Sequence, residues 1–171
     1  MKHFRKSRYY ETVYPRIYAY FSSHEKALRI LKIAYRGLPL LIAGAYAGIL
    51  VCSFIDRPRV FFLKELLIPA ALFVTVSLLR KIVDFKRPYS VYPIKSLVSK
   101  QKTGESFPSR HSASAVIIAA AGCFFSVPLG IILFIAALLV SATRLLSGVH
   151  FPLDVAAGWA FGLGFGLLFF L

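Results

Sequence analysis

Residues 37–55 read GLPLLIAGAYAGILVCSFI and contain no charged side chain. An α-helix of ~20 apolar residues spans the ~30 Å hydrocarbon layer of a bilayer, so this stretch predicts a membrane-spanning helix. Outward from it, similar apolar runs occupy residues 60–79, 112–127, 129–143 and 152–171. The chain is therefore predicted to be all-α, an integral membrane helical bundle of about five transmembrane helices.

The composition also favours a membrane protein over a soluble helical one. Hydrophobic residues make up 58% of the chain and the mean hydropathy is +0.70, whereas soluble domains contain about 45–50% apolar residues. The formal net charge is +14. Such an excess is typical of cytoplasmic loops and of contact with anionic lipid headgroups. Nucleic acid is not expected as a partner, because no soluble basic domain remains outside the apolar segments.

The N-terminal 36 residues differ in character from the rest. Residues 1–36 are predicted to be a basic amphipathic segment at the membrane surface, and residues 37–171 a membrane-embedded domain. Residues 26–36 alternate apolar and basic side chains. This part of the chain either lies flat on the surface or lengthens the first spanning helix.

Local signals divide this N-terminal segment further. Pro15 is expected to break any helix at its position. Residues 16–21 combine Tyr and Phe with Arg, which suits the level of the lipid headgroups. Ser22 with Glu25 three residues later predicts a capping box at the start of the next helix.

The scarce polar groups collect at the edges of the apolar runs, within residues 80–88, 108–111 and 144–154. Two spans separate the second cluster from the third, so both fall on one membrane face. One polar loop joins the first cluster to the second, so the first shares that face. The predicted topology alone therefore brings three distant clusters together.

The first cluster contains two arginines. Arg80 and Arg87 are nearly two helical turns apart, so both project from one face if the helix continues that far, and Pro88 then ends it. Adjacent guanidinium groups repel each other unless an anion lies between them, and their forked donors suit phosphate oxygens. The alternative is that both are ordinary arginines at the membrane boundary.

The second cluster begins a long apolar run. Ser109 is placed to be a helix N-cap, with Arg110 and His111 in the first turn. A helix N-terminus offers free N–H groups to an anion, and His111 could donate a proton to a leaving oxygen. The alternative is a capped helix with an interfacial histidine.

The third cluster follows an apolar run. Arg144 is expected to have a function there, because arginine is costly inside a membrane. His150 and Asp154 are four residues apart, the spacing that brings a carboxylate against an imidazole on a helix. The carboxylate then fixes the tautomer and leaves the other ring nitrogen as a base or nucleophile. The alternative is a capping Asp and a His at headgroup level.

Two other chemistries fit some of these residue types. A zinc site could use two histidines and an aspartate, but the nearby arginines would repel a dication. A serine hydrolase could use Ser109, His150 and Asp154, but it gives the arginines no role. Cys52 and Cys123 lie inside apolar runs and are expected to be core hydrophobes.

Together the clusters resemble the type-2 phosphatidic-acid phosphatase superfamily, which contains membrane lipid phosphatases and is related to bacterial acid phosphatases and vanadium haloperoxidases. The family pattern is Lys-x6-Arg-Pro, Pro-Ser-Gly-His and Ser-Arg-x5-His-x3-Asp. The chain offers Arg80-x6-Arg87-Pro88, Pro108-Ser109-Arg110-His111 and Thr143-Arg144-x5-His150-x3-Asp154. The resemblance covers roughly residues 37–171.

The resemblance implies a metal-independent hydrolase without a cofactor. His150 would form a phosphohistidine, Asp154 would orient it, and His111 would protonate the leaving group. The implied phosphate-binding residues are Arg80, Arg87, Ser109, Arg110 and Arg144. The implied substrate is a lipid phosphate or diphosphate, such as phosphatidate, phosphatidylglycerol phosphate or a polyprenyl phosphate, with no obligate protein partner. The alternative is non-enzymatic binding or transport of anionic lipids by the same residues.

Three positions depart from the family pattern: Arg80 replaces Lys, Arg110 replaces Gly, and Thr143 replaces Ser. None removes a catalytic group, and the first two are expected to alter substrate choice. We expect a multi-pass protein of the plasma (cell) membrane. With five spans, the positive-inside rule predicts that the site faces the cytoplasm. Many relatives act on the outer face. The site of this chain would also face outward if residues 16–36 formed an additional crossing.

Overall fold

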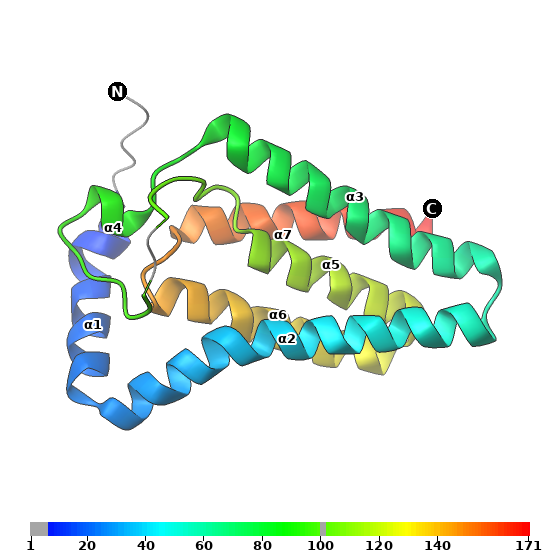
Figure 1. Ribbon diagram of the computed structural model, residues 1–171, viewed down its shortest axis with the longest axis horizontal. Coiled ribbons are helices and arrows are strands. Elements are labelled where there is room, and N and C mark those ends of the chain that lie inside the picture. The colour runs from blue at the N-terminus through cyan, green and yellow to red at the C-terminus, as the bar shows by residue number, and fades with distance from the viewer. Residues whose placement is uncertain (1–6, 100–101) are drawn as a thin grey trace.

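The computed structural model describes residues 7–99 and 102–171, and these residues form helices joined by loops (Figure 1). In chain order the helical elements are a π-helix at Tyr9–Val13, α1 (Tyr14–Ser23), α2 (Glu25–Asp56), α3 (Arg59–Val83), α4 (Pro88–Val91), α5 (Arg110–Phe125), α6 (Val127–Leu146), α7 (Pro152–Gly166) and a terminal 3₁₀ turn at Leu167–Phe170. No strand occurs in the described ranges.

Five long helices run side by side, and α5 is the central one (Figure 1). It packs against α2, α3, α6 and α7. From Ser112 to Gly122 every residue of α5 except Ser114 is buried. The outer helices carry exposed large apolar side chains, among them Leu40, Phe54 and Ile82. A bundle with an enclosed central helix and an apolar outer surface suits a lipid environment.

Within the described residues, four helical stretches are long and apolar enough to cross a membrane, namely those that contain α2, α3, α6 and α7. The fifth, α5, is apolar but has only 16 residues. The prediction of an all-α integral membrane bundle, with about five transmembrane helices plus an N-terminal amphipathic segment, is confirmed.

Small residues allow α7 to approach α5 closely. A Cβ added at Gly158 would lie 2.7 Å from the carbonyl oxygen of Ser109, and one added at Gly162 would lie 2.6 Å from the Cβ of Val116. Both positions therefore require glycine. This close contact, typical of small residues spaced four apart, joins α7 to the helix that begins at Ser109.

The N-terminal segment differs from its prediction in two places. Pro15 does not break a helix: the π-helix at Tyr9–Val13 continues directly into α1, and Pro15 lies in the first turn of α1. Ser22 is not a helix N-cap. It lies near the end of α1, and α2 begins after His24 without a capping side chain.

Helix α2 is continuous from Glu25 to Asp56, so residues 26–36 lengthen the first spanning helix. At about 1.5 Å per residue, a helix of 32 residues is ~48 Å long and extends beyond a ~30 Å hydrocarbon layer. The proposed boundary after residue 36 falls within this helix. Helix α1 lies across the end of the bundle (Figure 1).

Candidate active site

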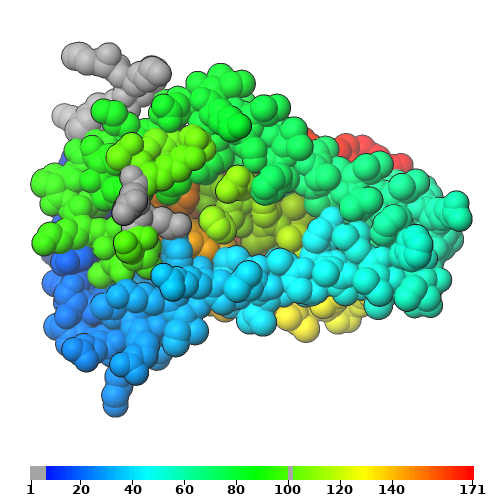
Figure 2. Space-filling model, in the orientation of Figure 1, coloured from blue at the N-terminus to red at the C-terminus, as the bar shows by residue number. Residues whose placement is uncertain are grey.

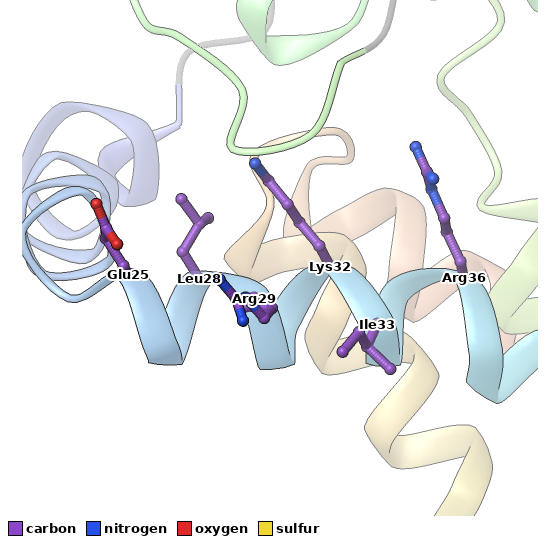
Figure 3. A pocket seen from close by; sticks show the side chains of 6 residues that line it. All are labelled: Glu25, Leu28, Arg29, Lys32, Ile33 and Arg36. Atoms are coloured by element: carbon purple, nitrogen blue, oxygen red, sulfur yellow. The ribbon is translucent and has the colours of Figure 1, made fainter.

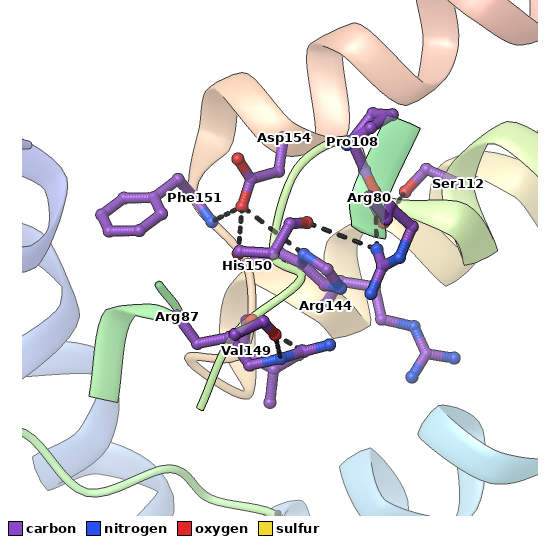
Figure 4. Close-up of polar contacts among 12 residues, drawn as sticks. Arg80, Arg87, Pro108, Ser112, Arg144, Val149, His150, Phe151 and Asp154 are labelled. Atoms are coloured by element: carbon purple, nitrogen blue, oxygen red, sulfur yellow. Dashed lines mark hydrogen bonds and ion pairs between the residues drawn. The ribbon is translucent and has the colours of Figure 1, made fainter. Parts of the chain in front are cut away.

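The loops after α3 and α6 and the start of α5 meet at one end of the bundle, the end covered by α1 (Figure 1). At this end Arg80, Arg87, Arg144, His150 and Asp154 come together (Figure 4). All five side chains are buried. The convergence expected from counting spans is therefore present, although its details differ from the expectation.

The two arginines of the first cluster meet through a turn rather than along one helix. Helix α3 ends at Val83, and Asp84 follows in the left-handed conformation with φ of 42°. The condition for Arg80 and Arg87 to share one helix face, that the helix continues to Arg87, is therefore not met. The Asp84 carboxylate instead accepts a hydrogen bond from the backbone N–H of Glu105 at 3.0 Å, which folds the loop back over α3.

Both arginines are held by backbone carbonyls of the other two clusters. Arg80 donates a hydrogen bond to the Pro108 carbonyl at 2.6 Å. Arg87 donates to the Gly104 carbonyl at 3.1 Å and to the Val149 carbonyl at 3.2 Å. These contacts fix the position of each guanidinium group while leaving its charge without a carboxylate partner.

Ser109 occupies the N-cap position of α5, but its side chain makes no capping hydrogen bond. Its hydroxyl lies 3.0 Å from that of Ser112, and both serines are fully buried. The Ser109 backbone N–H donates to the Asp154 carbonyl at 2.8 Å. The start of α5 is thus joined to the first turn of α7, and its first turn of N–H groups faces the same end of the bundle as the arginines.

Arg110 and His111 lie on the open side of the site. Both are exposed, and both line a cavity of about 250 Å³ between α2, α3 and α5. The Arg110 guanidinium lies over the ring of Phe73, 5.2 Å from its centroid. The Arg110 side chain therefore points toward this cavity and is not among the buried arginines.

Arg144 is 1% exposed and is held from α2. It donates a hydrogen bond to the Tyr35 carbonyl at 2.9 Å, and its guanidinium carbon lies 3.8 Å from the centroid of the Tyr35 ring. Its Nε atom is buried and has no hydrogen-bond partner. A buried donor without a partner is costly, so a site that supplies an acceptor there is favoured.

His150 and Asp154 face each other across the α6–α7 loop. The Nδ1 atom of His150 lies 3.5 Å from Oδ2 of Asp154, close enough for attraction but too long for a well-formed hydrogen bond. The same Oδ2 accepts hydrogen bonds from the Ser106 hydroxyl at 2.5 Å and from the Phe151 N–H at 2.9 Å. Asp154 is thus held in place, and a small rotation of the imidazole would complete the pair.

The electrostatic environment keeps His150 neutral. Burial lowers the pKa of His150 to about 4; Asp154 opposes this shift, and the charges of Arg87 and Arg80 add to it. The ring is therefore unprotonated at neutral pH, as a nucleophile or base requires. The three buried arginines outnumber the one buried carboxylate here, so the pocket attracts an anion.

Sequence reasoning missed Ser106 and Tyr35, and it also missed Tyr10, whose hydroxyl donates a hydrogen bond to the His150 carbonyl at 2.7 Å. Ser106 stands two residues before a predicted motif, a position that gave a weak signal. The Tyr10 hydroxyl donates to a backbone carbonyl, and the backbone carbonyl of Tyr35 accepts from Arg144. Hydrogen bonds to backbone carbonyls leave no recognisable pattern in the sequence. Across residues 7–99 and 102–171, no group of three or more His, Cys, Asp or Glu side chains is arranged to hold a metal ion.

The first part of α2 carries a row of basic side chains. A hollow of about 450 Å³ along α2 is lined by Arg29, Lys32 and Arg36, with Glu25 at one end. Lys32 and Arg36 point toward the loop between α4 and α5, whereas Arg29 and Ile33 point away from it (Figure 3). Such a row suits the level of anionic headgroups.

The fold and the site define a class: a helical membrane protein with an arginine-lined anion pocket around a histidine–aspartate pair. The chain matches the sequence pattern of the PAP2 superfamily over residues 61–171, which is more than half of its length. The chain belongs to this superfamily, the family that its three clusters resemble. Comparison with curated protein sequences finds no match.

Solved structures share the fold. LpxE from Aquifex aeolicus superposes with a TM-score of 0.67 and 27% sequence identity, covering 82% of this chain and 86% of that protein. A transmembrane PAP2 type phosphatidylglycerolphosphate phosphatase from Bacillus subtilis superposes with a TM-score of 0.56 and 23% identity, covering 94% and 92%. The second likeness concerns the fold alone. Both include the region before residue 61 in part, since each covers more of the chain than the family pattern does.

Proposed function

We propose that this protein hydrolyses a lipid phosphate monoester or diphosphate through a phosphohistidine on His150, without a metal or a cofactor. One observation carries the proposal. A neutral, fully buried histidine lies beside a fixed carboxylate and among three buried arginines, at the head of an apolar groove. Membership of the PAP2 superfamily supports it.

In the first step the free ring nitrogen of His150 attacks phosphorus, and the bond from phosphorus to the leaving oxygen breaks. His111 gives that oxygen a proton. Asp154 stabilises the positive charge that develops on the His150 ring. The buried arginines and the N–H groups at the start of α5 stabilise the charge on the phosphoryl oxygens. The orphaned Nε of Arg144 is one donor for these oxygens.

In the second step a water molecule attacks the phosphohistidine. His111, now unprotonated, takes a proton from the water, the bond from phosphorus to nitrogen breaks, and inorganic phosphate leaves. Both histidines return to their starting states, so one ester bond and one water molecule are consumed in each cycle. The arginines supply the charge stabilisation that a metal ion gives in other phosphatases.

A groove between α2 and α3 supports a lipid as the substrate. The cavity beside Arg110 and His111 continues into a second cavity of about 370 Å³, because Phe73, Ser114 and Ile118 line both. Figure 2 shows this hollow between α2 and α3, with α5 as its floor. An acyl or prenyl chain can lie in the groove while its phosphate reaches the arginines. The membrane is proposed, from the sequence alone, to be the plasma (cell) membrane.

Arg110 is proposed to select among such lipids. Its guanidinium stands at the mouth of the groove, between the buried arginines and the apolar floor. It is therefore placed to contact a second anionic group next to the transferred phosphoryl group, such as the second phosphate of a diphosphate. Glycine at this position, as in the family pattern, would offer no such contact.

The test uses purified protein and four substrates: phosphatidate, phosphatidylglycerol phosphate, a polyprenyl diphosphate and a sugar-linked polyprenyl phosphate. Wild type should release phosphate from at least one of them and carry label on a histidine after brief exposure to radiolabelled substrate. His150→Ala should lose turnover by at least about 10³-fold, as expected when a nucleophile is removed. His24→Ala, which changes an exposed histidine at the α1–α2 junction, is the control.

Two results would reject the proposal. Turnover by His150→Ala at the wild-type rate would reject the mechanism. Binding of lipid phosphates by wild type without phosphate release or labelled histidine would instead indicate the alternative function, namely binding or transport of anionic lipids.

A further inference from the structure

The loop that carries His150 is held by three tyrosines from the N-terminal segment. The Tyr9 hydroxyl donates to the Leu145 carbonyl at 3.3 Å, and the Tyr10 hydroxyl donates to the His150 carbonyl at 2.7 Å. The Tyr14 hydroxyl lies 2.9 Å from the Lys95 carbonyl and 3.3 Å from the Ser147 carbonyl. Carbonyl oxygens of the last turn of α6 and of the α6–α7 loop therefore receive donors from a segment more than 130 residues away in the chain.

A π-helix brings these tyrosines to one side. Residues 9–13 form the π-helix, and the backbone N–H of Tyr14 donates to the Tyr9 carbonyl five residues earlier. In an α-helix, positions 9 and 14 lie well apart around the axis, whereas the wider turn places them together. Single π turns occur often at functional sites, and this one carries the tyrosines that contact the loop of His150.

The contacts are buried and closely packed. Tyr10 is 1% exposed and Tyr14 is 0% exposed. The Tyr10 ring meets the Phe151 ring edge-on with centroids 5.3 Å apart, and it stacks on Tyr92 at 5.8 Å. Gly148 has φ of 73° and leaves no room for a Cβ beside the Tyr14 hydroxyl. At Gly148 the loop backbone packs directly against the Tyr14 side chain.

Tyr10 is the member of this group nearest to the chemistry. Its hydroxyl binds the peptide carbonyl of His150 itself, and its ring packs on the next residue, Phe151. The N–H of Phe151 donates to the carboxylate of Asp154. Tyr10 therefore fixes the peptide between the proposed nucleophile and the residue that holds its partner. Burial raises the pKa of Tyr10 far above its usual value, so its hydroxyl remains a donor at any pH of interest.

We propose that residues 9–14, defined here as the tyrosine clamp, position the imidazole of His150 for in-line attack, with Tyr10 as the positioning residue. The clamp lies outside the part of the chain that matches the family pattern, residues 61–171. The contacts of the clamp therefore do not belong to the region that defines the family. The inference rests on the proposed function, because it assigns His150 the role of nucleophile.

The test compares Tyr10→Phe, Tyr14→Phe and Tyr20→Phe with wild type. Each change removes one hydroxyl, and Tyr20, on α1 and 54% exposed, is the matched control. The readout is the rate constant for labelling of His150 in a rapid-mixing experiment, together with KM. A rate constant does not depend on the fraction of folded protein, whereas the amplitude of labelling does.

Tyr10→Phe is expected to slow labelling by about tenfold with little change in KM, since one buried hydrogen bond of about 1–1.5 kcal/mol is lost near the reacting ring. Tyr14→Phe should slow it less, by about threefold, because Tyr14 binds the loop three residues before His150. Tyr20→Phe should match wild type. A Tyr10→Phe protein that labels at the wild-type rate, with only its amplitude reduced, would overturn the inference and leave Tyr10 a purely structural role.

A second readout needs no substrate. In protein labelled with ¹⁵N at histidine, wild-type His150 should give the signals of one neutral tautomer at pH 7, whereas Tyr10→Phe should give averaged signals. Unchanged His150 signals in Tyr10→Phe would also overturn the inference. If wild type forms no phosphohistidine while these signals change in Tyr10→Phe, the proposed function fails and the positioning role stands.

Discussion

The two ends of the bundle both bury charged groups, but they use them differently. At the end opposite the site, Arg57 lies 3.6 Å from the carboxylate of Glu65 and donates to the Phe125 carbonyl at 2.9 Å. Its guanidinium also lies over the Phe125 ring, 4.6 Å from the centroid. One cation there meets one buried anion, and the result is a link between the α2–α3 turn and the end of α5.

At the site end three buried arginines face one buried aspartate. Arg80, Arg87 and Arg144 each donate to a backbone carbonyl, and with three guanidinium groups to one carboxylate positive charge remains in excess. The ion pair of Arg57 and Glu65 stabilises the connection between helices. The excess positive charge of the three buried arginines instead attracts an anion from outside the protein. The difference between the two ends is therefore the net buried charge, which is balanced at Arg57 and Glu65 and positive at the site end.

The largest expected effect comes from removing a charge at the site end. Arg144→Ala should lower kcat/KM by about 10²–10³-fold, the usual loss when one donor to a developing oxyanion is removed. Steady-state phosphate release measures it, with Arg57→Ala as a matched loss of an arginine that holds carbonyls at the other end. Arg144→Ala activity within threefold of wild type would contradict the role given to the buried arginines.

Low pH should lower the stability of the folded protein through protonation of His150. The pKa of His150 is about 4 in the folded chain and ~6.5 when unfolded, so between these values the unfolded chain binds more protons and stability falls as pH falls. The expected loss from pH 7 to pH 4 is on the order of 3 kcal/mol. Unfolding in detergent at several pH values measures it. His150→Asn should remove this part of the pH dependence; an identical profile would contradict the buried neutral state.

Breaking the balanced pair should cost stability rather than chemistry. Arg57→Ala leaves the fully buried Glu65 without a counter-charge and should lower the free energy of unfolding by roughly 2–3 kcal/mol. Adding Glu65→Gln should recover part of that loss, because no buried charge is then left unpaired. Both variants should keep wild-type turnover when assayed folded. A loss of turnover without a loss of stability would show that this end also serves catalysis.

The smallest effect is expected at the groove mouth. Arg110→Gly should lower kcat/KM for a diphosphate relative to a monoester by about threefold to fivefold, since a single exposed charged contact contributes about 0.5–1 kcal/mol. The ratio of the two rates, measured on the same protein preparation, cancels differences in folding. An unchanged ratio would mean that Arg110 does not touch the substrate beyond the transferred group.

The spanning helices could be predicted from the sequence because the property that selects them, an uninterrupted apolar run, is local. Their ends could not be placed as well. Pro15 was expected to break a helix, yet it lies in the first turn of α1. A proline signals both the end of one helix and the start of the next, and only the neighbouring packing decides which.

The meeting of the three clusters followed from counting spans, because each crossing reverses the chain and leaves no choice of side. Whether the helix of Arg80 continues to Arg87 could not be predicted, since the turn at Asp84 depends on a hydrogen bond to the distant Glu105. The tyrosine clamp could not be predicted either. Its partners are carbonyl oxygens, which every residue has, and its geometry follows a π-helix instead of the usual period.

The short central helix has a consequence for the bilayer. At about 1.5 Å per residue, the 16 residues of α5 extend ~24 Å, whereas the 25 residues of α3 extend ~38 Å. Helix α5 begins at the site, so the pocket is recessed below the ends of its taller neighbours. A lipid would reach it most easily where the hydrocarbon layer is thin. The distance between the lipid headgroup and the buried arginines therefore depends on the thickness of the membrane.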